Sequence, residues 1–548
     1  MLSFQLRATD CGGAWSSTSD GLHHGGSRIQ PFRHPALEDV RLISGDRLLV
    51  FVRERSARAN RPEGAFGVPT GRLTSVDAAS FDRLALELRT WPLQWHSLTV
   101  NGAPAGDGAD PERPLAALES GHWGTAPMFF VAEHGSLSGD WDAARLLPRL
   151  SASSLDPVRA ARYLAEYANP YGRDTLFHGL QLLTERARAT WAGPAGAETL
   201  SIAYPQPWLR PRAGVLREGA DPVAAMDTII EASIARWIDV AGVVVGVEVS
   251  GGLDSAIVAS HAAAGRAPLR SYGVALIDGP ERNQDGRRAE IVERFALIDT
   301  ATPMGSFLPL APGSCRLDGR APMLPWEEGY YETFDALLAG AAADGVNVML
   351  TGFGGDELCG LRPSEIREMS GQAARPSSRD PEPTPSFLTP RARATLTEAL
   401  DLPPRAACSE SAVECAALSA ARYMRHGIWP VHPLCTPELV QFCVRLPPEW
   451  RHKRRIEREV LARAGLSRRV THPSHTDNFS PAMAEGLRGP ARRLVRELFA
   501  DPALHRMGVV DRDELVRTYD AWCKQGPLDE AVHYFAAAVT ELCLKAMR

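Results

Sequence analysis

A short glycine- and serine-rich stretch, VEVSGGLDSAIVAS at residues 247–260, separates an aliphatic run from a helix-like run. A loop between a buried strand and the start of a helix has several backbone N–H groups that point outward at the positive end of the helix dipole. Gly251 and Gly252 let such a backbone approach an anion closely, because glycine carries no Cβ atom. The hydroxyl groups of Ser250 and Ser255 can add hydrogen bonds. The stretch therefore predicts a phosphate-binding loop.

Asp254 is the one residue of this loop that should repel phosphate. A carboxylate beside phosphate groups implies a divalent cation between them, and Mg²⁺ is the expected cation. The loop has neither the lysine of the Gly-x-x-x-x-Gly-Lys-Ser/Thr motif nor the Gly-x-Gly-x-x-Gly spacing of dinucleotide folds. A glycine and serine turn with an aspartate helix cap is the structural alternative. The sequence favours a site for a magnesium-bound phosphate group.

A second strand runs into a glycine-rich acidic loop in VMLTGFGGDELCG, residues 348–360. In a doubly wound sheet this strand would end at the same edge as the first, so Asp356 is expected to face Asp254 across one Mg²⁺. Taken alone, Asp356 could be a turn carboxylate. A magnesium ion held by two carboxylates suits the departure of pyrophosphate, because the ion neutralises the charge that develops on it.

The elements that must position these loops follow from the hydrophobic pattern. Residues 1–150 show short β-like runs such as VRLISGDRLLVFVRE, separated by turns, which indicates an antiparallel all-β or α+β module. Residues 155–190 predict two helices, LDPVRAARYLAEYA and LFHGLQLLTERARATW. Farther along, buried aliphatic strands such as VVVGVEV alternate with helices, which is typical of a doubly wound parallel sheet. The predicted fold class is α/β.

The chain of 548 residues is long enough for more than one core. We expect an N-terminal domain over residues 1–205 and a second domain over residues 206–548 that ends in helices. A flexible loop is expected at 367–405, because residues 371–390 contain five prolines and little that could form a core.

Composition narrows the function classes. A net charge of −6 disfavours a nucleic-acid-binding protein. The sequence has neither an apolar run long enough to cross a membrane nor a secretion signal, so a cytoplasmic location is expected. Its nine cysteines include no Cys-x-x-Cys pair, which disfavours both a zinc site and a disulfide framework.

The first loop resembles the Ser-Gly-Gly-x-Asp-Ser pyrophosphate loop of the N-type ATP pyrophosphatases. With the second loop, the chain resembles the asparagine synthetase and β-lactam synthetase family over nearly its whole length. This resemblance implies a degenerate glutaminase-like antiparallel β-sandwich, followed by a synthetase domain that uses ATP and Mg²⁺. It implies that Asp254 and Asp356 bind the metal and act in catalysis. The implied nucleotide contacts are Val249, Ser250, Gly251, Gly252, Leu253, Asp254, Ser255, Val274, Thr351 and Gly352.

Two departures from the family pattern concern the amine that forms the amide bond. Asparagine synthetases have a nucleophilic cysteine directly after the initiator methionine, whereas this chain begins Met1-Leu2-Ser3. Cys11 is no ready substitute, because that chemistry uses the free N-terminal amine beside the thiol. We therefore expect the amine to come with the substrate. Phe353 stands where β-lactam synthetases have the tyrosine of a proton-accepting Tyr-Glu dyad, and phenylalanine cannot take a proton.

The segments GFGGDEL, GSLSGDWDAARLL and PERNQDGRRAEIVERF resemble those of the lasso peptide cyclases within this family. That resemblance implies a macrolactam synthetase, in which a side-chain Asp or Glu carboxylate of a precursor peptide is adenylated and then attacked by the peptide's N-terminal amine. Its implied partners are the precursor peptide, a leader peptidase and a leader-recognition protein, with no nucleic acid and no membrane. The alternatives are a β-lactam synthetase-like or asparagine synthetase-like ligase acting on a small amino-acid-type substrate, and a non-catalytic binding module.

Two catalytic groups need replacements in this chain. Glu414, in SAVECAALSAARYM, is the carboxylate predicted to stand for the acidic half of the dyad, and an exposed helix charge is the alternative. The family's catalytic lysine is missing, because Ser474 falls at its place. His472, His475 or a residue of RHKRRIERE at 451–459 could supply the charge, and each could instead be a solvated surface group.

Overall fold

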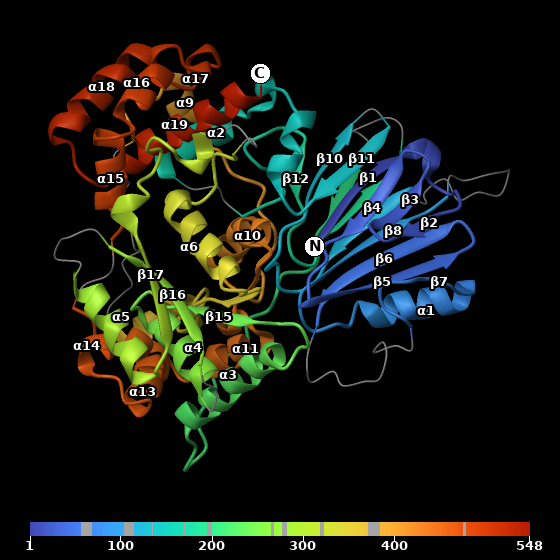
Figure 1. Cartoon of the computed structure of the whole chain (residues 1–548), viewed down its shortest axis with the longest axis horizontal. Helices are drawn as coiled ribbons and strands as arrows, with labels where there is room; N and C mark the ends of the chain where they lie inside the picture. Colours follow the sequence, from blue (N-terminus) through green and yellow to red (C-terminus); the bar gives the residue numbers. More distant parts are fainter. Residues whose placement is uncertain are drawn as a thin grey trace.

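A computed structural model describes residues 1–55, 68–102, 114–133, 135–167, 171–193, 200–264, 268–276, 282–317, 323–370, 384–474 and 478–547. Within these ranges the chain forms three β-sheets (Figure 1). Two of the sheets use strands that precede residue 204, and the third uses strands that follow residue 244.

The first sheet is antiparallel and has seven strands. Buried and partly exposed residues alternate along its strand β1, as the two-residue period of a strand requires: Leu2, Phe4 and Leu6 are buried. In spatial order the strands are β12 (Leu180–Leu182), β10 (Phe129–Glu133), β11 (Ser136–Asp140), β1 (Leu2–Arg7), β4 (Ser27–Pro31), β3 (Gly21–His24) and β2 (Ser16–Thr18).

The second sheet also has seven strands, which are antiparallel except that β7 runs parallel to β5. Its buried side chains, such as Phe51 and Leu98, belong to the same hydrophobic core as Leu6 and Ile29 of the first sheet. Helix α1 (Ala78–Leu88), capped by Asp77, contacts β5. In spatial order the strands are β14 (Leu200–Ala203), β13 (Arg188–Trp191), β9 (Ala116–Ser120), β8 (Trp95–Val100), β6 (Arg47–Glu54), β5 (Leu37–Ser44) and β7 (Leu73–Ser75).

The third sheet has five parallel strands. Their spatial order is β17 (Ile298–Pro303), β16 (Arg270–Ala275), β15 (Val245–Glu248), β18 (Val348–Leu350) and β19 (Trp429–Val431). From β15 the chain builds outward through β16 and β17 and then returns to build the other side from β18. The point between β15 and β18 is therefore the topological switch point, where ligands bind in open α/β sheets.

Helices cover both faces of this sheet. On one face, α4 (Leu253–Ala263) contacts β15 and packs with α3 (Pro222–Ile238) and α13 (Arg455–Arg463). On the other face, α6 (Tyr331–Ala343) contacts β16 and β17, and α10 (Glu410–Arg425) contacts β19. The doubly wound arrangement expected from the sequence is thus present in the described residues.

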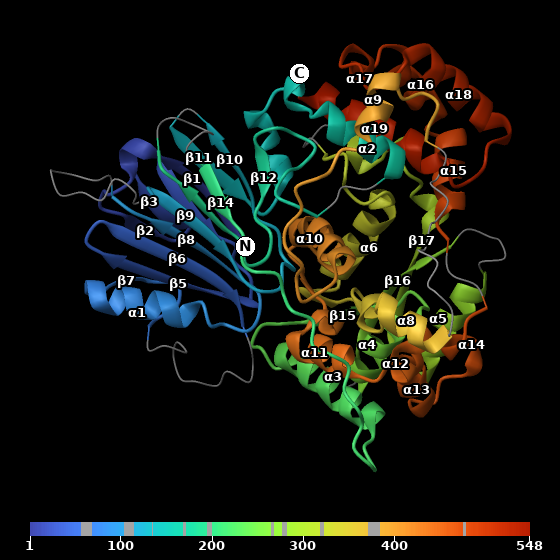
Figure 2. The same cartoon turned by 180° about the vertical axis from the view of Figure 1, so that it is seen from behind.

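The remaining helices surround the parallel sheet or form a group at the end of the chain. Figure 2 shows α12 near α13, which it contacts. Those near the sheet are α5 (Arg282–Arg294), α7 (Gly355–Leu358), α8 (Pro363–Ser370), α11 (Pro437–Arg445), α12 (Pro448–Arg451) and α14 (Arg468–Thr471). The terminal group contains α15 (Ser480–Arg488), α16 (Arg492–Ala500), α17 (Ala503–Arg506), α18 (Arg512–Gln525) and α19 (Ala531–Ala546).

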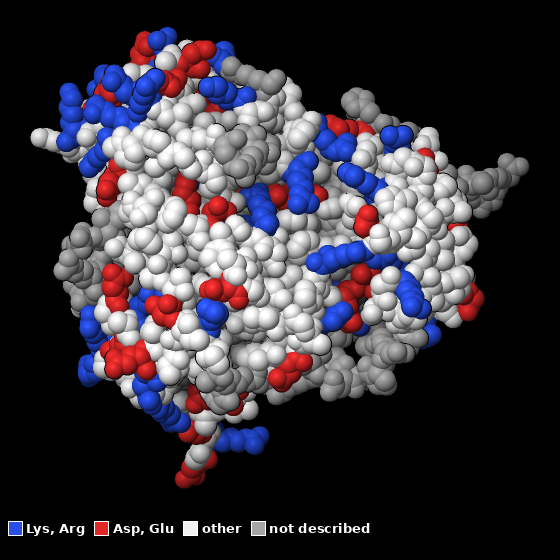
Figure 3. Space-filling model, in the orientation of Figure 1, with Lys and Arg blue, Asp and Glu red and all other residues white. Residues whose placement is uncertain are grey.

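Helix α2 (Pro157–Glu166) joins this terminal group although it precedes the parallel sheet in sequence (Figure 1). It contacts both α19 and α9 (Pro390–Thr395). The His533 ring on α19 lies 2.9 Å from the carbonyl oxygen of Leu164 on α2. In Figure 3, Lys and Arg side chains gather over the terminal helices at the upper left, with Asp and Glu among them.

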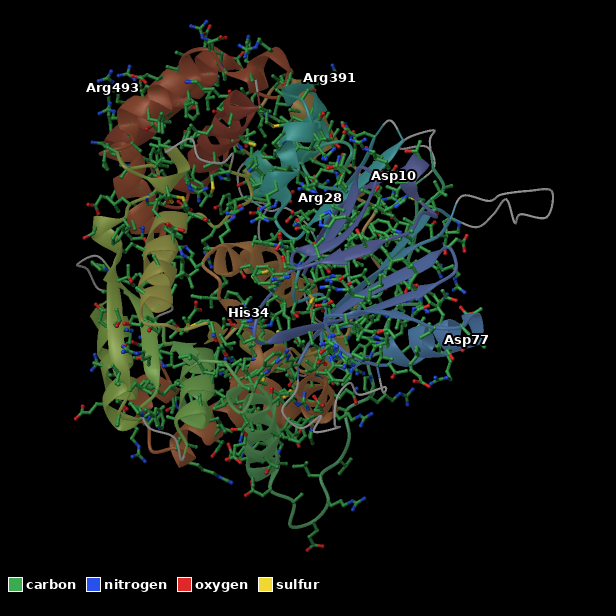
Figure 4. The ribbon with its side chains drawn as sticks, turned by 45° about the vertical axis from the view of Figure 1, so that its right-hand side comes forward. Asp10, Arg28, His34, Asp77, Arg391 and Arg493 are labelled. Carbon is green, nitrogen blue, oxygen red and sulfur yellow. The ribbon has the colours of Figure 1, made fainter. Side chains whose placement is uncertain are left out.

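Polar groups join the antiparallel sheets to the parallel sheet. The indole N–H of Trp429 on β19 donates to Glu54 on β6 at 2.8 Å. Burial raises the pKa of Glu54 to about 7, while the bonds from Trp429 and from the Gln94 backbone oppose that rise. His34 lies 6.4 Å from Trp429 between ring centroids, and Figure 4 shows it where the N-terminal strands meet the rest of the molecule.

Two expectations from the sequence need correction. LFHGLQLLTERARATW is not a helix: it contains β12 and β13, which pair with β10 and β9. Their pairing with strands distant in sequence overrides the local helical pattern. The range 367–405 is not one continuous loop, because it includes the end of α8 and all of α9. Residues 371–383 lie outside the described residues.

Arg425 on α10 provides a test of the contact between the N-terminal part of the chain and the helices of the parallel sheet. Its guanidinium donates to Asp142 at 2.6 and 2.8 Å and to Glu327 at 2.8 Å, and both carboxylates are almost fully buried. Arg425→Met leaves two buried carboxylates without this partner, so we expect a loss of about 3–5 kcal/mol in unfolding free energy. Urea unfolding followed by tryptophan fluorescence measures it. Arg493→Met, at a side chain that is 93% exposed on α16, is the control and should leave the midpoint unchanged. Equal midpoints for the Arg425 variant and the wild type would contradict the prediction.

Candidate active site

The first predicted loop connects β15 to α4 at the switch point. Gly251 has a φ of +89°, which L side chains rarely adopt. A Cβ atom at Gly251 would also lie 2.7 Å from the carbonyl oxygen of Gln284 and 3.2 Å from the backbone nitrogen of Arg288. Both the backbone conformation and the close approach of α5 therefore require glycine at this position.

The serine hydroxyls of the loop bind each other. Ser250 Oγ lies 3.0 Å from Ser255 Oγ and accepts a hydrogen bond from the Gly252 N–H at 3.2 Å. The helix cap is Gly252, which has no side chain to satisfy the first N–H groups of α4. Because α4 spans eleven residues, its first turn offers an oriented dipole and N–H donors to an anion.

Two buried arginines of α5 hold the carbonyl groups of this loop. Arg287 Nε donates to the Gly251 oxygen at 2.9 Å, and Arg288 Nε donates to the Val249 oxygen at 2.9 Å. Arg288 also pairs with Asp299 on β17. These contacts direct the two loop carbonyl oxygens toward α5. Both arginines lie in PERNQDGRRAEIVERF, but neither is among the site residues expected from the sequence.

The second predicted loop follows β18 and touches the first. The Thr351 hydroxyl lies 2.7 Å from His432 Nδ1, and the Phe353 ring stacks on the His432 ring with centroids 5.3 Å apart. A Cβ atom at Gly355 would collide with the carboxylate of Asp254. Glycine at 355 is therefore what allows the two loops to meet.

Arg454 bridges the two acidic loops. Its guanidinium forms ion pairs with Asp254, Asp356 and Glu457. Burial raises the pKa of Asp254 to about 6; Arg454 opposes that rise, and Asp356 and Glu357 add to it. Burial likewise raises the pKa of Glu457 to about 8, again with Arg454 opposing. One cation thus offsets the repulsion among three carboxylates.

The position of Arg454 depends on the start of α13. Lys453 and Arg454 both have positive φ angles, 51° and 59°, and α13 begins at the next residue. Helix α13 packs on α4, which brings the guanidinium to the first loop. Cys359 donates to Glu457 at 3.2 Å and links the second loop to the same helix. Arg454 belongs to RHKRRIERE, where the sequence suggested a source of charge but not which residue supplies it.

The carboxylates of Asp254 and Asp356 fit a magnesium ion. Both converge on one cationic group, and Mg²⁺ commonly binds through one or two carboxylates together with phosphate oxygens. The described residues contain no group of three or more His, Cys, Asp or Glu side chains placed to hold a metal ion.

The other predicted site residues occupy several kinds of position. Val249, Leu253, Val274 and Thr351 are buried and support the loops, whereas Ser250, Gly252, Asp254 and Gly352 are at least partly exposed. Glu414 is half-buried on α10, where burial raises its pKa to about 7 and Glu410 adds to that rise. His472 and Ser474 are both exposed, and His475 lies outside the described residues.

A cavity of about 430 Å³ adjoins the second loop. Gly354 and Glu357 of that loop line it, together with residues of α10 and α11. Tyr171 and Glu185 contribute from the part of the chain that forms the antiparallel sheets. Its size is within the range of small-molecule sites in proteins.

The parallel sheet, with a glycine- and serine-rich loop and an acidic loop at its switch point, defines a doubly wound α/β protein with a candidate anion site. The asparagine synthase family model matches residues 225–398 and 418–543, which together make up more than half of the chain. The chain belongs to the asparagine synthase family, whose members are ATP-dependent amide-forming ligases.

Other comparisons add little to this assignment. No curated protein matches the chain. A solved structure with some similarity is the U34-tRNA thiolase NcsA from Methanococcus maripaludis with its [4Fe-4S] cluster. It is 12% identical, and the match covers 56% of this chain and 79% of that chain with a TM-score of 0.23. Among the described residues, none of the helices has the length and apolar character that a membrane crossing requires.

The two aspartates give the first test of the site. Asp254→Asn and Asp356→Asn should each lower ATP–pyrophosphate exchange by about 10²–10³-fold, since each removes a carboxylate that would hold the Mg²⁺ on the leaving group. Exchange of labelled pyrophosphate into ATP measures the effect. Asp513→Asn, at a side chain that is 94% exposed on α18, is the matched control. Normal exchange in either site variant would rule out a role for that carboxylate.

Arg454 gives a second, independent test. Arg454→Met removes the cation that occupies the position between the carboxylates, so Mn²⁺ should bind about tenfold or more tightly without ATP. Pyrophosphate exchange should fall in the same variant, because a positive charge beside the phosphates is lost. Calorimetry and the exchange assay measure the two effects. Arg455→Met, which removes a half-exposed neighbouring arginine, should change neither the Mn²⁺ affinity nor the exchange rate. Unchanged Mn²⁺ affinity in the Arg454 variant would show that Arg454 and the metal do not compete for the carboxylates.

Proposed function

We propose that this protein is an ATP-dependent, AMP-forming ligase that closes a macrolactam ring in a precursor peptide. The observation that supports the ligase activity is the convergence of Asp254 and Asp356 on one cation, directly beside the uncapped start of α4. The macrolactam product and the peptide substrate rest on the resemblance to lasso peptide cyclases.

The chain's own groups have distinct roles toward ATP in this proposal. The first N–H groups of α4 and the hydroxyls of Ser250 and Ser255 bind the pyrophosphate portion. Asp254 and Asp356 hold Mg²⁺, which, when bound, neutralises charge on the leaving pyrophosphate. Arg454 exchanges its carboxylate partners for phosphate and so supplies the charge of the missing family lysine. The backbone around Val249, Val274, Thr351 and Gly352 borders the adenosine.

The reaction has two steps. A side-chain carboxylate of the peptide attacks the α-phosphorus, and pyrophosphate leaves in line with the attacking oxygen. The N-terminal amine of the same peptide then attacks the acyl carbon, and AMP leaves. Adenylation is needed because a carboxylate is a poor acylating agent, whereas AMP is a good leaving group. Holding the amine close to the acyl group is a major part of the catalysis.

Two structural observations support an amine that arrives with the substrate. The Cys11 thiol is buried and donates to the Arg7 carbonyl oxygen at 3.4 Å. Burial raises its pKa to about 12, with a smaller contribution from Asp10, so it is a poor nucleophile. We therefore propose that residues 1–205 form a degenerate glutaminase-like domain of the β-sandwich type, and that residues 206–548 form the synthetase domain.

The same proposal covers substrate binding and partners. The cavity beside Gly354 and Glu357 has room for a few side chains of the peptide. Phe353, stacked on His432, provides a wall but no proton acceptor. A leader peptidase that exposes the N-terminal amine and a protein that recognises the leader segment would act with this enzyme.

Mass spectrometry tests the proposed reaction. We expect a cognate precursor peptide, incubated with the protein and Mg·ATP, to lose the mass of one water while AMP and pyrophosphate accumulate. Fragmentation should place the new bond between the N-terminus and one Asp or Glu side chain. The same mixture with the Asp356→Asn variant should show no dehydration.

Different results would point to other functions. Release of ADP would exclude adenylation. If AMP is released with a small amino-acid-type acid but with none of the peptides tested, the alternative of a β-lactam synthetase-like or asparagine synthetase-like ligase would be favoured. Failure of exchange with every acid tested would favour a binding module without catalysis.

A further inference from the structure

Glu248 ends the central strand β15, two residues before Ser250 of the anion-binding loop. Its carboxylate accepts a hydrogen bond of 2.6 Å from the hydroxyl of Tyr423 on α10. Tyr423 is fully buried, whereas Glu248 is partly exposed. The pair therefore fixes a carboxylate at the carboxyl end of β15, on the edge of the sheet from which both loops start.

Glu248 lies on the sheet face opposite α4. Side chains alternate along a strand, and Val247 and Val249 are buried in the core that includes α4. A Cβ atom at Gly246 would instead meet Tyr272, Val346 and Met349, which pack with α6. Glu248 is two residues from Gly246, so its side chain belongs to the α6 and α10 face, as the bond to Tyr423 requires.

This face is where the acyl group should lie. In an in-line displacement, the attacking carboxylate approaches the α-phosphorus from the side opposite the leaving pyrophosphate. The start of α4 is expected to hold the pyrophosphate, so the acid approaches from the opposite side. The amine that later attacks the acyl carbon must reach the same place.

We propose that Glu248 is the catalytic base of the second step and that Tyr423 is its positioning residue. The inference rests on the proposed function. As the amine nitrogen forms the new C–N bond, the bond from the acyl carbon to the AMP oxygen breaks and AMP leaves with the electron pair. The proton released by the nitrogen passes to the carboxylate of Glu248. This Tyr-Glu pair takes the role that Phe353 cannot perform.

The surroundings of Glu248 make its carboxylate a stronger base than an ordinary one. Burial raises its pKa; the Tyr423 hydroxyl and Arg422 lower it, and Glu328 raises it further. Arg422 lies on α10 with its Nη1 atom 3.5 Å from the carboxylate of Glu328, which precedes α6. A carboxylate with a raised pKa takes a proton from an ammonium group more readily than an ordinary one does.

Variants separate the two steps of the reaction. Glu248→Gln should retain pyrophosphate exchange and form the hydroxamate when hydroxylamine, an amine already neutral at neutral pH, traps the acyl-adenylate. Ring closure by the same variant should fall by about 10²–10⁴-fold at neutral pH. It should partly recover above a pH of about 8, where the peptide's N-terminal amine loses its proton to solvent.

Tyr423→Phe tests the positioning role through the pH profile. The hydroxyl lowers the pKa of Glu248, so its removal should raise that pKa and move the acidic limb of ring closure to higher pH. A purely structural role for Tyr423 would lower the rate at every pH without this shift. Glu248→Asp should restore part of the activity lost in Glu248→Gln.

Two other carboxylates serve as comparisons. Glu497→Gln, at a side chain that is 61% exposed on α16, should behave as the wild type. Ring closure at the wild-type rate in Glu248→Gln, or equal loss of exchange and closure, would overturn the inference. Loss of closure alone in Glu414→Gln, with normal closure in Glu248→Gln, would assign the base to Glu414. Absence of exchange in the wild type would instead refute the proposed function itself.

Discussion

The candidate site depends on mutual repulsion between carboxylates that the fold forces together. Asp254 and Asp356 come from loops separated by about a hundred residues, and Glu457 is fully buried on α13. Like charges at a partly desolvated site are costly unless a cation lies between them. In this structure the cation is the guanidinium of Arg454. A nucleotide and a metal ion that bind at these carboxylates would therefore replace an existing ion-pair network rather than fill an uncharged space.

Sheet topology brings those loops together. The strands β15 and β18 are neighbours at the switch point, so the residues that follow them share one edge. Gly251 and Gly355 then remove the Cβ atoms that would keep α5 and Asp254 away. The buried pair of Arg287 and Arg288 fixes the direction of the first loop. Each part of the site thus depends on backbone packing as well as on its acidic side chains.

The sequence predicts the parts of this site that are local. The strand-to-helix junction at Ser250 and the second glycine-rich loop follow from patterns of about ten residues, and the structure brings Asp254 and Asp356 together. Arg454 could not be selected, because its place depends on two successive left-handed residues and on the packing of α13 against α4. In the sequence, Glu248 is a single acidic residue within an aliphatic strand, and the pattern alone does not indicate a site residue. The strands in LFHGLQLLTERARATW were missed because their partners, β9 and β10, are distant in sequence.

The contact between α2 and α19 has a consequence for how the chain can be divided. Leu164 and Phe535 are fully buried, and the His533 ring reaches the backbone of α2, so the last helix relies on residues that come before the parallel sheet. A fragment that starts at residue 206 would expose an apolar surface of the terminal helices to water. The two segments are therefore better regarded as folding partners than as separable modules, and co-expression of both halves is the route by which a split enzyme would assemble.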